Sequence, residues 1–245
     1  MTVNGRVALV TGASSGIGKA VALQLAAGGA TVAVADINTD QLHKTVNEIN
    51  ALGGVSMAII CDVSKKAECE AMVKSTINAY GHLDILVHCA GILIDCSLKK
   101  LTEETFDKVH RINLKGSLFC VQAVMEAMKE QQYGRVVLLS SGAYLGNAGQ
   151  TAYSTAKAGV VALTKVAAKE LAKYNITVNS IAPGMVQTPM TAGMPQEAYD
   201  AICMKIPLGR IGLPEDVAHF VMAFVADEAG YVTGQVLLID GGTRS

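Results

Sequence analysis

Short runs rich in valine, isoleucine and alanine recur along the chain, and stretches with helical periodicity separate them. Strands of this kind are buried on both faces, so the alternation predicts an α/β protein with a doubly wound parallel sheet. A single domain of residues 1–245 is expected, with helices on both faces of a seven-stranded sheet. The seven predicted strands are Val7–Val10, Thr31–Ala35, Ser56–Cys61, Ile85–His88, Arg135–Leu139, Thr177–Ile181 and Val236–Ile239.

Polar residues and glycines mark where the intervening helices begin and end. Asn38 or Thr39 is expected to cap a helix that runs to about Ala51, Ser64 to cap the next helix, and Gly81 to end it. The alternation stops between residues 183 and 212, a stretch rich in glycine, proline and methionine. Irregular segments of this length in a domain are usually functional, so a functional insert is predicted at about 184–212.

A glycine-rich turn follows the first predicted strand and opens a helix. It reads Thr-Gly-Ala-Ser-Ser-Gly-Ile-Gly over residues 11–18, and such glycines let the backbone approach a pyrophosphate that the helix N-terminus holds. The second strand ends in Asp36, 18 residues after Gly18, where an acid can bond the ribose hydroxyls of a dinucleotide. This context predicts a Rossmann-type domain whose turn and acidic residue bind a dinucleotide.

The carboxylate of Asp36 also discriminates between cofactors. It would repel a 2′-phosphate, and no lysine or arginine occurs at residues 13–15 or just after Asp36 to neutralise one. NAD is therefore predicted rather than NADP. Asp62 and Val63, at the end of the third strand, either reach the adenine or form an ordinary approach to a helix, and the sequence favours neither interpretation.

Tyr153 and Lys157 lie four residues apart at the start of the helical pattern 152–173, so they share one face. An ammonium beside a phenol favours the phenolate and is expected to lower the tyrosine pKa from its reference value of about 10, as acid–base catalysis requires. Ser140 ends the preceding strand, at the carboxyl edge of the sheet. Its hydroxyl is placed to bond a substrate carbonyl.

Taken together, these motifs resemble the short-chain dehydrogenase/reductase family over essentially the whole chain. The resemblance rests on the glycine-rich turn, Asp36, Asp62, Asn113, Ser140, the run Tyr153–Lys157, Pro183-Gly184 with Thr188, and the closing Asp240-Gly241-Gly242. It implies hydride transfer between a nicotinamide cofactor and an alcohol or ketone, with the 184–212 insert covering the substrate.

The resemblance also implies a role for each site residue. Tyr153 is the general acid/base, Ser140 orients and polarises the carbonyl, and Asn113 holds a water in the proton path. Lys157 binds the nicotinamide ribose and lowers the Tyr153 pKa. The implied cofactor residues are Gly12, Ser14, Ser15, Gly16, Ile17, Gly18, Asp36, Ile37, Asp62, Val63, Cys89, Ala90, Gly91, Tyr153, Lys157, Pro183, Gly184, Val186 and Thr188.

The chain departs from the family pattern after the fourth strand, where His88-Cys89-Ala90-Gly91 replaces the usual Asn-Asn-Ala-Gly. The replacement is expected to remove side-chain hydrogen bonds that tie neighbouring strands together. A single histidine at a buried strand end is interpreted as structural rather than as a base. Cys89 is interpreted as a core residue, because no paired base is evident.

Two substrate classes are open. The methionines of the insert form either an adaptable apolar wall or ordinary packing, and the wall favours an apolar ketone or secondary alcohol. The alternative is a 3-oxoacyl thioester on a carrier protein or CoA, because the pattern also resembles 3-oxoacyl carrier-protein reductases. Those enzymes need basic surface near the pocket mouth, where the only cations expected are Lys129, Arg135 and Lys173. The insert methionines are Met185, Met190, Met194 and Met204.

A protein that binds NAD without catalysis is a further interpretation. It has no need for Ser140, Tyr153, Lys157 and Asn113 together, and all four are present, which favours an enzyme.

Composition indicates which kinds of partner and which cellular compartment to expect. A net charge of −1 supplies no field for nucleic acid, and no apolar run approaches the roughly 18 residues of a membrane span. The six cysteines are scattered without metal-ligand spacing, which favours reduced thiols, no metal and a cytoplasmic location. The predicted helices 102–129 and 152–173 have wide apolar faces that pack against other subunits in the family, so a homotetramer is expected.

Overall fold

Seven parallel strands form one sheet in the order β3-β2-β1-β4-β5-β6-β7 in the structure, a computed structural model that describes residues 3–189 and 191–244. This result confirms the predicted sheet, and every predicted strand occurs within two residues of its expected bounds. The strands are β1 (Val7–Thr11), β2 (Thr31–Asp36), β3 (Ser56–Ile60), β4 (Ile85–His88), β5 (Gly134–Leu139), β6 (Ile176–Pro183) and β7 (Val236–Ile239).

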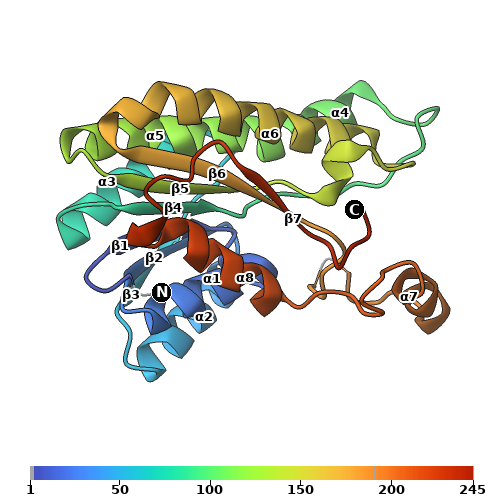
Figure 1. The fold of residues 1–245 in the computed structure, drawn as a ribbon, viewed down its shortest axis with the longest axis horizontal. Coiled ribbons are helices and arrows are strands. Elements are labelled where there is room, and N and C mark those ends of the chain that lie inside the picture. Colours follow the sequence, from blue (N-terminus) through green and yellow to red (C-terminus); the bar gives the residue numbers. More distant parts are fainter. Residues whose placement is uncertain (1–2, 190, 245) are drawn as a thin grey trace.

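Helices cover both faces of the sheet (Figure 1). One face packs against α1 (Gly16–Ala27), α2 (Thr39–Ala51) and α8 (Pro214–Val225), and the other against α3 (Lys66–Tyr80), α5 (Gly116–Glu130) and α6 (Thr151–Leu171). Each layer buries its own aliphatic cluster, because a strand with two buried faces sends alternate side chains into both. No helix within the described residues is long and apolar enough to cross a membrane.

The long helix predicted over 102–129 is divided in the structure. α4 (Glu103–His110) is followed by a π-helical turn, Arg111–Lys115, and only then by α5. The apolar periodicity continues through this break, which is why the sequence pattern did not show it. π-helical turns are frequent at functional sites, and this one carries the fully buried Asn113.

Other helix ends follow their local hydrogen bonds. Asn38 caps α2 as expected, since its Oδ1 accepts from the Gln41 amide at 3.2 Å. The predicted cap at Ser64 is wrong, because the Ser64 amide donates to Asp62 Oδ1 at 3.0 Å and α3 begins after Lys65. Gly81 ends α3 with φ +87, a left-handed conformation that favours glycine. There is a short 3₁₀ turn before α6, at Gly142–Leu145, and another after it, at Ala172–Tyr174. A third follows α8, at Asp227–Ala229.

The 184–212 insert is closed at its base and carries one helix, α7 (Gln196–Cys203). Val186 and Gly212 form an isolated parallel β-bridge. The Gly212 amide donates to the Met185 carbonyl at 2.9 Å, and the Gln187 amide donates to the Gly212 carbonyl at 2.8 Å. The two ends of the insert are therefore held together, and α7 lies beyond the sheet, away from the helices that cover its faces (Figure 1).

Candidate functional site

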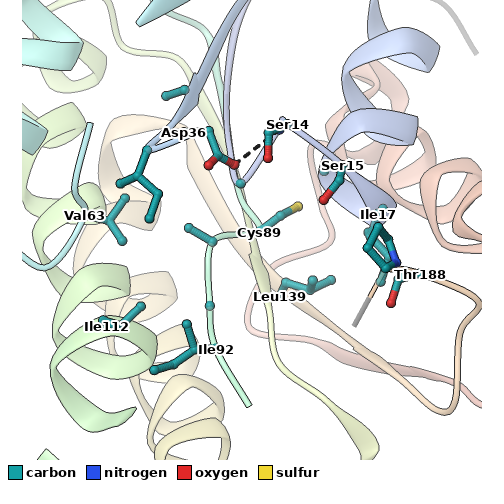
Figure 2. A pocket seen from close by; sticks show the side chains of 18 of the residues that line it. Ser14, Ser15, Ile17, Asp36, Val63, Cys89, Ile92, Ile112, Leu139 and Thr188 are labelled. Atoms are coloured by element: carbon teal, nitrogen blue, oxygen red, sulfur yellow. Dashed lines mark hydrogen bonds between the residues drawn. The ribbon is translucent and has the colours of Figure 1, made fainter. Parts of the chain in front are cut away.

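A cavity of about 360 Å³ lies at the carboxyl ends of the strands, beside β1 and β4, where the winding of the sheet reverses. Open α/β sheets bind their ligands at such switch points. Most of the predicted cofactor residues line this cavity (Figure 2). They are Gly12, Ser14, Ser15, Gly16, Ile17, Gly18, Asp36, Ile37, Asp62, Val63, Cys89, Ala90, Gly91, Tyr153, Lys157 and Thr188.

The sequence did not identify several apolar residues that also line this cavity. Figure 2 shows Ile92 and Ile112 on the side of the cavity away from Asp36. Their only sequence signal was their position beside Gly91 and Asn113, because isoleucine carries no chemistry that separates a cavity wall from the core. The additional lining residues are Ala35, Cys61, Ile92, Ile112, Leu139 and Pro189.

The glycine-rich turn packs so closely that side chains would not fit. Gly12 has φ +67, and a Cβ at this position would lie 2.7 Å from the Ala90 amide nitrogen. A Cβ on Gly18 would collide with the Gly12 carbonyl oxygen. The turn therefore presents bare backbone to the cavity at the N-terminus of α1, and this cradle fits the pyrophosphate of a dinucleotide.

The Asp36 carboxylate is held at the end of β2 by two backbone amides. Its Oδ2 accepts from Ser14 at 3.2 Å (Figure 2), and its Oδ1 accepts from Asn38 at 3.0 Å. Of the described residues that line this cavity, Lys157 alone carries a positive charge. A ribose with free hydroxyls therefore fits beside Asp36, whereas a 2′-phosphate would meet an unneutralised carboxylate.

A second cavity of about 300 Å³ adjoins the first. Tyr153, Ile17, Leu139 and Thr188 line both cavities, and Ser140 lines the second. Three predicted cofactor residues, Pro183, Gly184 and Val186, line the second cavity and not the first. The phenol of Tyr153 thus belongs to the boundary between a dinucleotide-sized cavity and a separate small-molecule cavity.

Of the predicted catalytic residues, Ser140, Lys157 and Asn113 are buried and Tyr153 is half-buried, and hydrogen bonds to backbone carbonyls connect Ser140 with Lys157. The Ser140 hydroxyl donates to the Lys157 carbonyl at 3.0 Å, and Lys157 Nζ donates to the Leu139 carbonyl at 2.6 Å. Lys157 Nζ lies 5.7 Å from the ring centroid of Tyr153. Ser141, which the sequence analysis did not single out, lines the second cavity and hydrogen-bonds the Tyr153 side chain. The one feature of the sequence that could have indicated Ser141 is that it follows Ser140 directly after the fifth strand.

The expected lowering of the Tyr153 pKa by Lys157 is wrong for the structure. Burial raises the pKa of Tyr153 above its ordinary value, by more than the Ser141 hydrogen bond lowers it. Burial also lowers the pKa of Lys157, to about 8. The physical reason is that both groups are removed from water while the ammonium is directed at a carbonyl oxygen rather than at the phenol.

We expect the free protein to keep the Tyr153 proton throughout the neutral range. A raised phenol pKa means that the neutral proton donor predominates at every pH below it, and that the phenolate increases tenfold per pH unit. The measurement is an ultraviolet difference titration at 295 nm between the wild-type protein and Tyr153→Phe. Tyrosinate absorbance at this position with a midpoint below about pH 9 would contradict the expectation and restore the lowered pKa.

Asn113 holds backbone rather than presenting a free amide. Its Oδ1 accepts from the Ile92 amide at 2.8 Å, and its Nδ2 donates to the Ile92 carbonyl at 2.8 Å. The side chain therefore fixes the segment after β4 against the π-helical turn. Binding of a water by Asn113 stays a prediction.

His88 restores a side-chain bond that its replacement of asparagine was expected to remove. A 2.8 Å hydrogen bond joins His88 Nδ1 to Thr11 Oγ1, across the neighbouring strands β4 and β1. Burial, followed by the charge of Lys157, lowers the pKa of His88 to about 3, so the ring is neutral. These features support the structural interpretation of His88. Cys89 is half-buried and lines the first cavity.

The insert contributes little methionine to the second cavity. Met185 lines it, whereas Met194 does not and Met204 is 82% exposed. Met190 lies outside the described residues. The segment around α7 instead contributes Ile202, from the helix itself, and Lys205 and Ile206, which follow it.

The cations expected at the pocket mouth lie at the other edge of the sheet. Arg135 is buried at the start of β5, and Ser140 follows the end of that strand. Lys129 lies at the end of α5, before β5, and Lys173 lies after α6, before β6. Lys129 Nζ also donates to Glu126 Oε1 at 2.9 Å. The cations that line the second cavity are Lys205 and Arg244, which the sequence analysis did not identify.

No group of three or more His, Cys, Asp and Glu side chains in residues 3–189 and 191–244 could hold a metal ion. All six cysteines are free.

The doubly wound sheet, the glycine cradle and the adjoining cavities define a Rossmann-type protein. A family model described as enoyl-(acyl carrier protein) reductase matches residues 12–244. The chain belongs to the short-chain dehydrogenase/reductase family, and it is an oxidoreductase that acts on CH–OH or carbonyl groups. Members of this family typically use NAD or NADP.

Similar proteins match over nearly the whole chain. (2S)-((R)-hydroxy(phenyl)methyl)succinyl-CoA dehydrogenase subunit BbsD of Thauera aromatica is 43% identical, over 99% of this chain and 98% of its own. The 3-oxoacyl-(acyl-carrier-protein) reductase FabG of Thermotoga maritima is 44% identical, over 99% of both chains. The crystal structure of a short-chain type dehydrogenase/reductase from Mycobacterium marinum has a TM-score of 0.94 at 36% identity, covering 99% of this chain and 97% of that one.

Proposed function

We propose that this protein transfers a hydride between NAD(H) and a secondary alcohol or ketone, with Tyr153 as general acid/base. The observation that carries the proposal is the position of Tyr153 at the boundary of the two cavities, with Ser140 and Lys157 buried beside it. The Asp36 carboxylate, with Lys157 the one cation in the described lining of its cavity, supports NAD over NADP.

Each residue has a physical task in this proposal. When bound, the nicotinamide supplies or accepts the hydride. The Tyr153 hydroxyl gives its proton to the carbonyl oxygen in reduction, and the phenolate takes the hydroxyl proton in oxidation. Ser140 turns its hydroxyl from the Lys157 carbonyl toward the substrate oxygen, a rotation open to any hydroxyl. Lys157 holds the nicotinamide ribose.

Two substrate classes fit the second cavity. Its walls include Leu93, Val186, Ile202 and Ile206, which support a ketone with an apolar carbon skeleton. A 3-oxoacyl thioester on CoA or a carrier protein is the second candidate, and the names of BbsD and FabG favour it. Because of these apolar walls, we place the ketone first.

A substrate series with NADH tests the proposal. We expect kcat/KM to increase along a series of aliphatic and alicyclic ketones until the cavity is full, since each buried methylene contributes up to about 0.8 kcal/mol. Acetoacetyl-CoA and acetoacetyl carrier protein are measured beside them. An advantage of more than about 10²-fold for a thioester, about 2.7 kcal/mol of transition-state binding, would replace the ketone by the thioester class. Absence of NADH consumption with every substrate would overturn the proposed function.

Assembly and location are also proposals. We keep the homotetramer that the family resemblance implies and the cytoplasmic location that the scattered cysteines favour. Val166 on α6 and Phe220 on α8 are exposed apolar side chains on the outer helices, which supports contacts with further copies of the chain. Light scattering on the eluted protein measures the oligomeric state.

A further inference from the structure

Two cations line the second cavity. Lys205 follows α7, and Arg244 lies in the segment after β7. Within the described parts of the chain, neither side chain forms an ion pair with a carboxylate. The one acidic residue of the cavity lining, Asp240, uses Oδ1 to accept from the Gly242 amide at 3.0 Å. The described lining of this cavity therefore carries more positive than negative charge.

Arg244 is fixed in place by neutral oxygen atoms. Its Nη1 donates to the Gly146 carbonyl at 3.3 Å, and its Nη2 donates to Asn147 Oδ1. Asn147 is itself oriented, because its Nδ2 donates to Gln150 Oε1 at 3.0 Å. These bonds position the half-buried guanidinium without cancelling its charge, and the group has five N–H donors in total. Donors remain for a planar anion, for which guanidinium geometry is well suited.

An anion at Arg244 and a reacting carbon at Tyr153 would lie in the same cavity. Tyr153, Ser140 and Arg244 all line the volume of about 300 Å³. A small molecule can therefore place a carbonyl at Ser140 and Tyr153 and an anionic group at Arg244. Apolar side chains also line this cavity, among them Met185, Val186 and Ile206.

We propose that Arg244, assisted by Lys205, binds a carboxylate of the substrate. The substrate class is then an oxo or hydroxy acid with an apolar skeleton, in which a few carbons separate the carboxylate from the reacting carbon. This inference rests on the proposed function, because it assigns the substrate of the same site. Arg244 selects the substrate, and the proton transfer is left to Tyr153.

The test compares oxo acids with their uncharged methyl esters. The pairs are 3-oxobutanoate, 4-oxopentanoate and 5-oxohexanoate with the corresponding esters, assayed with NADH. We expect kcat/KM to favour the acid by at least about 30-fold for one or more chain lengths, the scale of a charge-assisted hydrogen-bonded pair. Arg244→Gln is expected to lower this acid-to-ester ratio by at least about tenfold, mainly through KM, and to leave the esters near wild-type.

Two further variants isolate the effect. Lys205→Gln is expected to lower the ratio less than Arg244→Gln, because Lys205 is exposed whereas Arg244 is half-buried. Lys74→Gln removes one positive charge from an exposed position on α3, away from both cavities, and should leave the ratio unchanged. An acid-to-ester ratio near one at every chain length, or a ratio that Arg244→Gln does not alter, would overturn the proposal.

A second pair of substrates distinguishes the source of the anion. Acetoacetyl-CoA carries phosphates, and the acetoacetyl thioester of N-acetylcysteamine carries none. If Arg244→Gln weakens only the CoA substrate and leaves the oxo acids unaffected, the phosphates of the carrier are the anion and the carboxylate proposal is wrong.

Calorimetry keeps this inference separate from the proposed function. The Tyr153→Phe variant is saturated with NADH and titrated with the three oxo acids. We expect the added Arg244→Gln change to raise the dissociation constant of the best-bound acid by at least about tenfold. If no substrate is turned over but this shift occurs, the proposed reaction fails and the carboxylate site stands. If turnover occurs with the ratio unchanged, the reaction stands and the carboxylate site fails.

Discussion

Replacement of Tyr153 by phenylalanine is expected to lower kcat by about 10²-fold or more, the usual scale for a general acid/base. Phenylalanine keeps the ring that lines both cavities and removes only the hydroxyl. NADH binding should therefore persist, and titration of NADH fluorescence checks it beside steady-state turnover. The centroid of the ring lies 5.7 Å from Lys157 Nζ, so phenylalanine also keeps the ring beside the ammonium.

Tyr80→Phe is the matched control for this experiment. Tyr80 is a half-buried tyrosine at the end of α3 that lines neither cavity, and its substitution should leave kcat unchanged. Near-normal turnover of Tyr153→Phe would show that another group moves the proton. Ser141 would then be the first residue to test, because its side chain bonds that of Tyr153.

A preference for NAD over NADP of at least about 10²-fold in kcat/KM is the second large effect expected. Repulsion from Asp36 and an unpaired 2′-phosphate should together cost a few kcal/mol, and about 1.4 kcal/mol corresponds to one decade. The paired change Asp36→Ser with Ile37→Arg should move the preference toward NADP. Ile37 is 71% exposed, so an arginine at this position takes nothing from the core.

The cofactor experiment needs one control for net charge. Asp40→Ser removes a carboxylate from the first turn of α2 but lies outside the cavity lining, and it should leave the preference unchanged. Equal efficiencies of the wild-type protein with the two cofactors would refute the assignment of Asp36.

The sequence predicted the parts of this protein that depend on local pattern. Strands such as β1 are buried along their whole length, so their apolar runs are continuous and easy to recognise. The glycine-rich turn was recognisable in the sequence because its geometry requires glycine: Gly12 approaches Ala90 too closely for any side chain to fit. Strand ends such as Asp36 and Ser140 could be assigned to one edge because the strands of a parallel sheet all end at the same edge.

Features that depend on tertiary placement were not predictable in this way. Lys205 and Arg244 come from segments without periodicity, so nothing in the chain indicated that they would share a cavity with Tyr153. The direction of the Tyr153 pKa shift depends on two opposing effects, the burial of the phenol and its distance from the Lys157 ammonium. The spacing of the two residues along a helix does not show which effect is larger.

The bridge between Val186 and Gly212 has a consequence for how substrate preference can evolve. Because this bridge fixes both ends of the intervening segment, added residues between them raise the entropic cost of closing the loop only slightly. Mutations and short insertions around α7 can therefore accumulate and reshape the wall of the second cavity. The glycine cradle and the Asp36 carboxylate lie outside the segment between Val186 and Gly212. Changes in this segment can therefore alter the substrate preference while the coenzyme preference is retained.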